Sequence, residues 1–441
     1  MTQGGGCPMG SRRGFLAAAG ALGANIGLGG ATTSAETGPV GESCAATAVE
    51  PFFGEHQSGI LTGLQSHSYF AAFDLMTTKL SDIEALLRAW TSAAAQMTAG
   101  NVVASLGKDT YSSAPASDSG EALDLGPARL TLTFGFGAGL FVKDGKDRYG
   151  LAAQRLAALV DMPAFNGDQL VPEHTGGDLS VQACANDPQV AFHAVRQLAR
   201  LAAGVAQIRW AQAGFSSDSA SGETPRNLMG FKDGTQNPVA PPPNGRSAGS
   251  TRPALSPNEV IFVGEEGPAW MKGGSYVMVR RIRIALEHWD RSDVDFQEQV
   301  IGRHKRSGAP LGGRDEFDPA DFQATDKDGN LIIPENAHMR LGAAAHNDGA
   351  LILRRSYSYN DGLSFIAERW PPWRQGMLYD AGLFFIAYQR DPRTGFIKIY
   401  DRMSKLDALA QFTTHIGGGL FACPRGIKQG EFIGQDLFQR A

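Results

Sequence analysis

The side chains best suited to chemistry lie in three short segments of the chain. Residues 230–235 read GFKDGT and place Asp233 beside a glycine. Residues 338–341 read HMRL and begin with a histidine, and residues 353–359 read LRRSYSY, in which Arg354 is the first arginine. A carboxylate can move a proton, an imidazole can ligate a metal, and a guanidinium can hold an anion without titrating. An Asp-Gly pair alone usually indicates a turn, so the segments are informative only in combination.

A fourth segment, residues 54–60, reads GEHQSGI. The four motifs occur in the order GEHQxGI, GxxDG, HxRL and LRRxYSY, on a chain whose two halves share one plan. Together they resemble the dye-decolourising peroxidase family, and more closely its secreted bacterial branch. The resemblance covers nearly all of the mature chain, and the four motifs together are far more specific than GxxDG alone. It implies an oxidoreductase, a DyP-type haem peroxidase, that reduces hydrogen peroxide with electrons from organic donors such as dyes and phenolic compounds.

The resemblance implies a role for each chemical residue. His338 matches the axial position, where an imidazole donates electron density to the haem iron, and the partner of its other ring nitrogen stays open. Asp233 matches the acid–base residue that takes a proton from peroxide and returns it to the leaving oxygen. Arg354 matches the guanidinium that stabilises bound hydroperoxide and keeps the carboxylate ionised. The haem would be held mainly by the second half of the chain.

Further haem contacts are implied around these residues. Gly234, Thr235 and Gln236 follow the aspartate and would lie against the haem, where a glycine allows close approach. Many relatives carry an arginine shortly after the axial histidine that pairs with a haem propionate, but residues 343–345 are all alanine here. Propionate pairing must then come from elsewhere, and Arg303 is the candidate.

Two neighbouring residues compete with these assignments. His346 lies in a loop eight residues before Arg354 and is the rival axial ligand. Arg355 is next along a predicted strand, so its side chain should point to the other face of the sheet and have a structural role. Tyrosines and tryptophans between residues 357 and 388 could pass electrons to the surface, but such residues are more often part of a core, and none is assigned as a site.

Two similar halves are expected to position these residues. In the first half, residues 81–97 carry apolar side chains at helical spacing, and Ser81 is expected to cap that helix. The predicted order is β-α-β-β-α-β, with strands at 68–75, 130–136, 178–185 and 207–214, helices at 81–97 and from Asp187, and an insertion near 150–171.

The second half repeats this plan. Its predicted strands are 275–284, 350–357, 383–389 and 418–423, and its predicted helices are 285–300 and 396–409. The Pro/Gly/Ser-rich residues 238–257 are interpreted as a linker between an N-terminal domain, 51–237, and a C-terminal domain, 258–441. The predicted fold class is α+β: duplicated ferredoxin-like domains with antiparallel sheets, in an architecture like that of a dimeric α+β barrel.

The composition limits the classes of partner. A chain of 441 residues is too long for one ordinary compact core, which favours two domains or an internal duplication. The 42% hydrophobic and 19% charged residues are typical of a folded soluble protein. A formal net charge of -5 provides no broad positive surface, so nucleic acid is not an expected partner.

The cysteines bear on the cofactor. Cys7, Cys44, Cys184 and Cys423 form no CxxC pair and no CxxCH motif, which argues against a cysteine zinc site and against c-type haem. Haem b is therefore expected to bind without covalent attachment, one per chain. Cys184 lies within an apolar run and is expected to be a core residue.

The first 35 residues have the order of an export signal. Residues 11–16 read SRRGFL, a weakly apolar Ala/Gly/Leu stretch follows, and residues 33–35 supply small side chains for a signal peptidase. Residues 1–35 are thus interpreted as a twin-arginine signal, recognised by the twin-arginine export machinery, and residues 36–50 as a mobile lead-in. This route carries folded proteins, which suits a chain that acquires its cofactor before export. The mature protein is expected in the periplasm or outside the cell, without a membrane span.

Two other functions are compatible with the same resemblance. Members of the secreted branch are proposed to act in iron acquisition, releasing iron from haem as deferrochelatases or working beside an iron permease, which would make an iron-uptake protein a partner. The second of these functions is that of a haem-binding or redox-sensing protein without turnover. Both predict exchangeable haem and little peroxide-dependent oxidation, whereas the presence of both Asp233 and Arg354 favours catalysis. The sequence leaves the natural donor, the pH optimum and homo-oligomerisation open.

Overall fold

The computed structural model describes residues 48–103, 118–217, 223–238, 257–367 and 375–439. They belong to one compact unit, Ser43–Ala441. The predicted signal, most of the predicted lead-in, nearly all of the predicted linker, Cys7, Cys44, Trp370 and Trp373 lie outside the described residues. Within the described ranges, no helix has both the length and the apolar character needed to cross a membrane.

The first half forms an antiparallel sheet with two long helices. Its strands pair in the order β4-β1-β3-β2, as a ferredoxin-like half requires. The elements are β1 (His67–Leu75), α1 (Leu80–Thr98), β2 (Thr131–Gly137), α2 (Ala138–Phe141), β3 (Leu179–Ala185), α3 (Pro188–Leu201) and β4 (Ala206–Phe215). Asp187 begins α3, because its carboxylate accepts hydrogen bonds from the backbone N–H groups of Gln189 and Val190.

The second half repeats the pairing in the order β9-β5-β8-β7, with the short strand β6 added beside β8. Its elements are α4 (Pro257–Val260), β5 (Ser275–Ile284), α5 (Leu286–Trp289), α6 (Val294–Ile301), α7 (His338–Gly342), β6 (Leu353–Arg354), β7 (Tyr357–Ala367), β8 (Gln375–Gln389), α8 (Phe396–Leu406), β9 (Thr413–Cys423) and α9 (Gln435–Phe438). The predicted duplication is confirmed.

The two sheets join into one closed sheet. Strand β4 pairs with β7 through Phe215 and Ser358, and β2 pairs with β9 through two residue pairs. Strand β5 bonds both β8 and β9, so the ring of strands is complete. Apolar side chains from both halves fill the interior, among them Phe70, Cys184, Trp210, Val277, Tyr357, Phe384 and Phe421. The predicted α+β barrel architecture is therefore confirmed.

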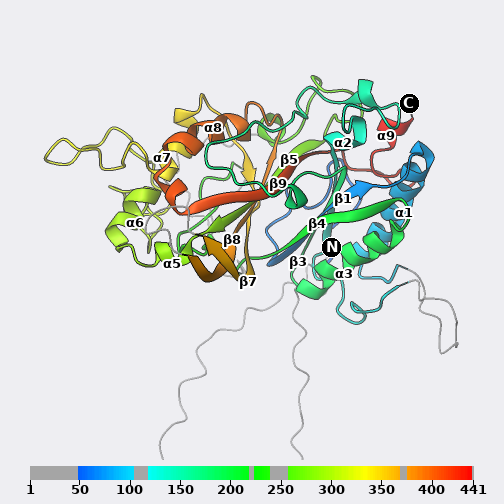
Figure 1. Ribbon diagram of the computed structural model, residues 1–441, viewed down its shortest axis with the longest axis horizontal. Coiled ribbons are helices and arrows are strands. Elements are labelled where there is room, and N and C mark those ends of the chain that lie inside the picture. Colours follow the sequence, from blue (N-terminus) through cyan, green and yellow to red (C-terminus); the bar gives the residue numbers. More distant parts are fainter. Residues whose placement is uncertain (1–47, 104–117, 218–222, 239–256, 368–374, 440–441) are drawn as a thin grey trace, which may run out of the picture. The chain divides into compact units, whose positions relative to one another are not determined.

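Helices cover the outside of the closed sheet in two groups (Figure 1). Helices α1 and α3 pack together over the first half, where the buried Trp90 donates from its indole N–H to the Leu198 carbonyl at 2.8 Å. Helices α5 to α8 gather over the second half, and α7 packs against α6 and α8. The histidine that begins α7 therefore belongs to the second half.

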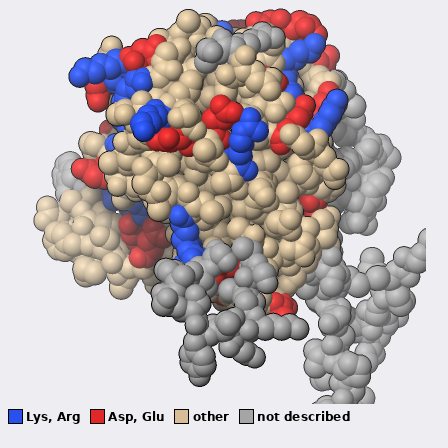
Figure 2. Space-filling view, turned by 90° about the vertical axis from the view of Figure 1, so that its right-hand side faces the viewer, with Lys and Arg blue, Asp and Glu red and all other residues tan. Residues whose placement is uncertain are grey.

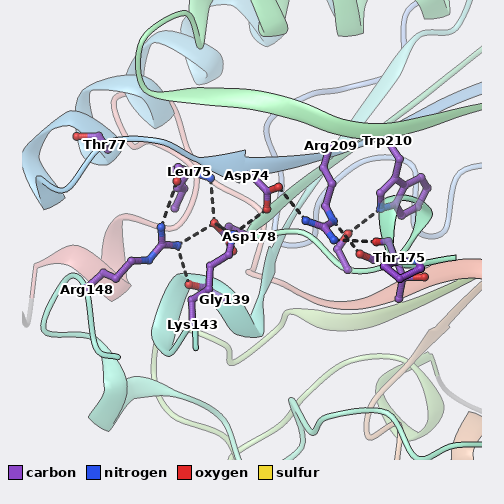
Figure 3. A network of polar contacts seen from close by, with 12 residues as sticks. Asp74, Leu75, Thr77, Gly139, Lys143, Arg148, Thr175, Asp178, Arg209 and Trp210 are labelled. Carbon is purple, nitrogen blue, oxygen red and sulfur yellow. Dashed lines mark hydrogen bonds and ion pairs between the residues drawn. The ribbon is translucent and has the colours of Figure 1, made fainter. Parts of the chain in front are cut away.

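A partly buried network of ion pairs, centred on the buried Asp178, holds loops of the first half against β1 and β4 (Figure 3). Asp178, whose side chain is 2% exposed, pairs with Lys143 at 3.0 Å and with Arg148 at 2.8 Å. Asp74 pairs with Lys143 at 2.8 Å and with Arg209 at 2.9 Å. Each charge has at least one opposite charge beside it, which offsets the cost of removing these groups from water.

Two predicted helices differ from the structure. The first helix begins at Leu80, so Ser81 lies inside it and does not cap it. The predicted helix at 285–300 is divided into α5 and α6. Asp293 causes the new start, because its carboxylate accepts a hydrogen bond from the Phe296 N–H at 2.8 Å and caps α6.

Two predicted strands also differ. The strand expected at 350–357 is replaced by β6 and β7, and the strand expected at 383–389 begins at Gln375, so that β7 and β8 form a long ribbon. The outer part of this ribbon exposes four apolar side chains in cross-strand pairs, Leu363 with Tyr379 and Phe365 with Met377. A sequence identifies a strand by apolar side chains that alternate with polar ones, so that one face is buried. The apolar side chains of this outer ribbon face solvent, so this pattern did not reveal its full length.

The surface carries mixed charge on the face shown in Figure 2. Lysines and arginines are interspersed there with aspartates and glutamates, and no broad area is positive. This face therefore offers no electropositive site for a polyanion.

Candidate active site

Asp233 lies in a tight loop that follows β4. Gly230 (φ 85°) and Gly234 (φ 110°) adopt the left-handed backbone region that glycine tolerates, so the turn requires both glycines of the GxxDG motif. Phe231, in the same loop, is buried against Trp289, with ring centroids 6.1 Å apart. The loop is thus shaped by its own glycines and anchored beside α5 of the second half.

Arg354 meets Asp233 from the second half. It lies on β6, and its Nη1 donates to Asp233 Oδ1 at 2.8 Å. The two side chains remain 28% and 21% exposed. Asn237 fixes the backbone of Arg354, since its side-chain amide donates to the Arg354 carbonyl at 2.7 Å and its side-chain oxygen accepts from the Arg354 N–H at 3.0 Å. The structure therefore brings the predicted acid–base residue and the predicted guanidinium together, and adds Asn237.

His338 begins α7 and is held by Asp407. Its Nδ1 lies 2.7 Å from Asp407 Oδ2, and Asp407 Oδ1 accepts from the Leu409 N–H at 2.8 Å. Burial lowers the pKa of His338, but the charge of Asp407 and its hydrogen bond outweigh burial, so that the pKa lies above its ordinary value. A carboxylate in this position orients the ring and increases the basicity of the other nitrogen. Asp407 is the partner that the sequence analysis left open.

His338 lies within electrostatic reach of the Asp233–Arg354 pair. After burial and Asp407, the charge of Arg354 lowers the pKa of His338 and the charge of Asp233 raises it. Its Nε2 has no hydrogen-bond partner within the described residues, and its side chain keeps 37% of its surface accessible. An accessible ring nitrogen near an ion-paired carboxylate and guanidinium fits a haem, whose iron His338 would hold through Nε2 while Asp233 and Arg354 would act on peroxide.

The other residues predicted to contact haem differ in their burial and in their hydrogen bonds. Thr235 is buried and its hydroxyl donates to Glu316 Oε1 at 2.9 Å, whereas Gln236 is exposed. Arg303 is buried, and its Nη1 donates to the backbone carbonyls of Gly308 at 2.6 Å and Glu316 at 3.0 Å. These carbonyl contacts give Arg303 a structural role, and its pairing with a haem propionate stays a prediction.

The rival axial ligand has a different environment. His346 packs edge-on against Phe322, with ring centroids 4.8 Å apart. Burial, together with the charges of Arg340 and Arg402, lowers the pKa of His346. Among the described residues no carboxylate bonds to its ring as Asp407 bonds to His338. The environment of an axial ligand is therefore found at His338.

Two residues predicted to be structural are buried in the barrel. Arg355 is 4% exposed, and its guanidinium donates to the Thr62 carbonyl and to the Gln65 side chain. The arginine that pairs with Asp233 is Arg354. Cys184 is fully buried and not in a disulfide. Both predictions are confirmed.

Comparison with known families and relatives gives matches along most of the chain. The family described as "Dyp-type peroxidase, N-terminal" matches residues 57–216, and "Dyp-type peroxidase, C-terminal" matches residues 224–428. A dye-decolorizing peroxidase of Thermobifida fusca (strain YX) is 36% identical over 455 residues, which covers 97% of each chain. A deferrochelatase of Escherichia coli (strain K12) is 35% identical over 399 residues, which covers 88% of this chain and 87% of the relative.

Solved structures have the same fold. A DyP-type peroxidase from Streptomyces coelicolor has a TM-score of 0.77 and 40% identity, covering 89% of this chain and 98% of its own. Another from Cellulomonas bogoriensis has a TM-score of 0.75 and 34% identity, covering 90% of this chain and 100% of its own. Asp233, His338 and Arg354 all lie within the second matched family range.

Proposed function

Because the chain belongs to the Dyp-type peroxidase family, we propose that Asp233, Arg354 and His338 form the site at which it reduces hydrogen peroxide. The protein is a haem-dependent peroxidase that oxidises organic donors, such as dyes and phenolic compounds. Its haem is haem b, one per chain, bound without covalent attachment because the chain contains no CxxCH motif. His338 would hold the haem iron through Nε2.

Each residue has one task in this proposal. When bound, haem would supply the iron at which peroxide is reduced and would pass the two oxidising equivalents of peroxide on to the organic donor. Asp233 takes a proton from one peroxide oxygen and returns it to the other, which leaves as water. Arg354, 2.8 Å from Asp233, holds the carboxylate in place through this ion pair and stabilises the negative charge that develops on peroxide. Asp407 orients the His338 ring.

The observation that carries the proposal is the presence of two charged pairs within electrostatic reach of one another. Asp233 and Arg354 are joined at 2.8 Å, and His338 and Asp407 at 2.7 Å. A protein that only binds haem needs the second pair but has no use for an acid and a guanidinium beside it. The Asp233–Arg354 pair therefore favours catalysis over haem binding without turnover.

Stopped-flow absorbance of the haem-loaded protein mixed with hydrogen peroxide tests this proposal. The wild type should show a rapid change of the Soret band that an organic donor reverses. Asp233→Ala and Arg354→Leu should each slow it by about 10²–10⁴-fold, the range for removing an acid–base or charge-stabilising group. Arg390→Leu removes an arginine paired with Glu266 elsewhere and should react like the wild type. A slow reaction, insensitive to both site variants, would overturn the mechanism.

Iron release from haem is the second candidate function, since the relatives include deferrochelatases. In that function haem is cargo, and a protein of iron uptake becomes the expected partner. Anaerobic incubation of the haem-loaded protein with a reductant and a ferrous chelator distinguishes the two functions. Fluorescence of metal-free porphyrin that appears only with the intact protein would favour iron release, and intact haem with rapid peroxide reduction would exclude it.

Export by the twin-arginine route is part of the proposal. The support is the SRRGFL motif at residues 11–16, followed by small residues at 33–35. The folded protein would then act in the periplasm or outside the cell. Replacing both Arg12 and Arg13 by Lys in the full chain should retain the haem-loaded protein in the cytoplasm, as measured by cell fractionation. Unchanged export of that variant would contradict this route.

A further inference from the structure

Glu316 is a buried acid in the second half whose side chain reaches the Asp233 loop. Its side chain is 7% exposed, and Oε2 lies 2.6 Å from Lys232 Nζ. Its Oε1 accepts a hydrogen bond from the Thr235 hydroxyl at 2.9 Å. Lys232 directly precedes Asp233 and Thr235 lies two residues after it. One carboxylate therefore binds the chain on both sides of the acid–base residue.

The carboxylate of Glu316 is itself held in place. Arg303 donates to the Glu316 carbonyl at 3.0 Å and to the Gly308 carbonyl at 2.6 Å, which ties together the two backbone segments around it. A Cβ atom at Gly308 would lie 2.8 Å from Lys232 Cδ and 3.3 Å from Glu316 Cγ. The Lys232–Glu316 pair thus packs directly on the Gly308 backbone, and neither side chain has room to shift toward it.

Glu316 is expected to stay ionised in this environment. Burial raises the pKa of Glu316, but the hydrogen bond from Lys232, with those from Thr224 and Thr235, outweighs burial, and the pKa lies below its ordinary value. Lys232 is only 12% exposed, so neither charge is strongly screened by water. Loss of the charge on Glu316 would leave a buried ammonium unpaired beside Asp233.

Other contacts of this loop reach different parts of the site. Arg226 donates to the Gly230 carbonyl at 2.8 Å and to the Arg306 carbonyl at 2.7 Å, which holds the first turn of the loop. Asn237 binds the backbone of Arg354. Among the described residues, Glu316 is the side chain that binds the side chains flanking Asp233 on both sides.

We propose that Glu316 is a positioning residue for peroxide reduction, and that it holds Asp233 at the distance and angle from Arg354 that proton transfer requires. The inference rests on the proposed function, since it assigns Glu316 an effect exerted through Asp233. Glu316 belongs to the second half, whereas the Asp233 loop trails the first half. Glu316 thus connects a loop that follows β4 in the chain to a segment 81 residues later, and both lie within the C-terminal family range.

A double-mutant cycle on the peroxide reaction tests this role. Glu316→Gln keeps the shape of the side chain but removes its charge, and should lower the bimolecular rate with hydrogen peroxide by about 10–100-fold, as expected for a small displacement of a reacting group. Asp233→Asn should lower the rate further. In the double variant the Glu316 change should add almost nothing, because it acts through Asp233. Glu316→Asp, which restores the charge, should recover part of the rate.

Glu298→Gln is the matched control. Glu298 is also a largely buried glutamate of the second half, but it binds His304 and the Lys305 N–H rather than residues 232–235. Its variant should react with peroxide like the wild type. Amide hydrogen exchange of the haem-free protein provides a second measurement, in which Glu316→Gln should speed exchange at residues 226–237 and leave β1 and β3 unchanged.

The outcomes separate this inference from the proposed function. A fast wild type, a slow Asp233→Asn and an unaffected Glu316→Gln would overturn the role of Glu316 alone, as would additive losses in the double variant. A slow wild type that ignores Asp233→Asn would overturn the proposed function itself. If Glu316→Gln does not load haem, Thr235→Val removes one of the two bonds without stranding a charge. An unchanged peroxide rate in Thr235→Val would then contradict the inference.

Discussion

The two clusters of charged side chains in this protein differ in how completely their charges are satisfied. In the first half, Asp178 and Asp74 together bind three cations, and Asp178 is 2% exposed (Figure 3). In the second half, Asp233 has one cation beside it and His338 has one carboxylate, and the Asp233 and His338 side chains stay 21% and 37% exposed. The cations are similarly exposed in the two clusters, at 24–30% in the first and 28% for Arg354, so the difference lies in the acids: Asp74 and Asp178 each meet two cations, and Asp233 meets one. A carboxylate shared by two cations contributes stability, whereas one with a single cation can still bind a ligand.

The backbone contacts of the first cluster strengthen this contrast. Arg148 donates to the carbonyls of Leu75 and Gly139, both at 3.1 Å. Arg209 donates to the Thr175 carbonyl at 2.8 Å as well as to Asp74 (Figure 3). The guanidinium N–H groups of Arg148 and Arg209 therefore fix loops against β1 and β4. At the candidate active site, Arg354 donates to Asp233 through Nη1, and among the described residues its guanidinium donates to no backbone carbonyl.

The largest expected effect on folding is that of Asp178→Ala. The change leaves Lys143 and Arg148 without this buried carboxylate and also removes the acceptor of the Leu75 N–H. The free energy of unfolding should fall by about 3–5 kcal/mol, the usual cost of removing one partner from a buried ion pair. Urea denaturation followed by circular dichroism measures this loss.

Matched measurements show whether the two clusters are independent. The folded, haem-loaded Asp178→Ala protein should react with peroxide within about twofold of the wild type, since the network contains no residue of the candidate site. Glu84→Ala breaks an exposed pair with Arg88 and should cost less than about 1 kcal/mol. A loss of peroxide reactivity in Asp178→Ala as large as that of Asp233→Ala would refute the separation of stability from function.

Asp407→Asn tests the opposite side of the comparison. The asparagine keeps a side-chain oxygen near His338 Nδ1 but removes the charge, so haem affinity should fall by about 10–100-fold, as for other partners of metal-ligating histidines. The rate of haem transfer to an excess of a haem-free globin measures this affinity. Asp401→Asn, which breaks an exposed pair with Lys405 on α8, should leave the transfer rate unchanged.

The stability of the haem-free protein completes this test. Asp407→Asn should change its free energy of unfolding by only about 1 kcal/mol, because the His338–Asp407 pair is single and partly accessible. A stability loss equal to that of Asp178→Ala, with haem affinity intact, would mean that Asp407 serves the fold rather than the haem. The comparison between the two clusters would then fail.

Local signals in the sequence predicted most helices and strands, whereas the roles of Asp233, His338 and Arg354 came from the family resemblance and stay predictions. Asp187 before Pro188 begins α3, and the glycines around Asp233 take the positive φ that the turn requires. Both signals depend on neighbours in the chain. The structure places His338 at the start of the short helix α7, which the motif did not predict.

Two partners distant in sequence, Asp407 and Glu316, were not predicted, because no local pattern specifies them. Asp407 lies 69 residues after His338, and Glu316 lies 81 residues after Thr235. Each pair forms only in the tertiary structure, even though His338 and Asp407 both belong to the second half. Closure of the sheet also depends on residues distant in sequence, since β4 pairs with β7 through Phe215 and Ser358. The sequence therefore predicts which side chains act and leaves the residues that orient them to the tertiary structure.

The smallest expected effect is the pH dependence of Asp74. Burial raises the pKa of Asp74, but hydrogen bonds and charges of Lys143 and Arg209 outweigh it, so the pKa lies below the ordinary value of 3.8. The ionised group therefore stabilises the fold above pH 3.8, and this contribution is lost as the pH falls through the lower folded pKa. Asp74→Asn should be less stable than the wild type by about 1 kcal/mol at pH 7.

The gap between the two proteins should shrink as the pH falls from about 4 toward about 2.5, since a protonated aspartate and the asparagine that replaces it are both uncharged. Urea unfolding at about pH 7, 4 and 2.5 measures this gap. A gap that stays constant would mean that Asp74 contributes through hydrogen bonds that an amide cannot replace, rather than through its charge. A gap that closes would show that the first cluster stabilises the fold by charge neutralisation, the property that the candidate active site leaves incomplete around Asp233 and His338.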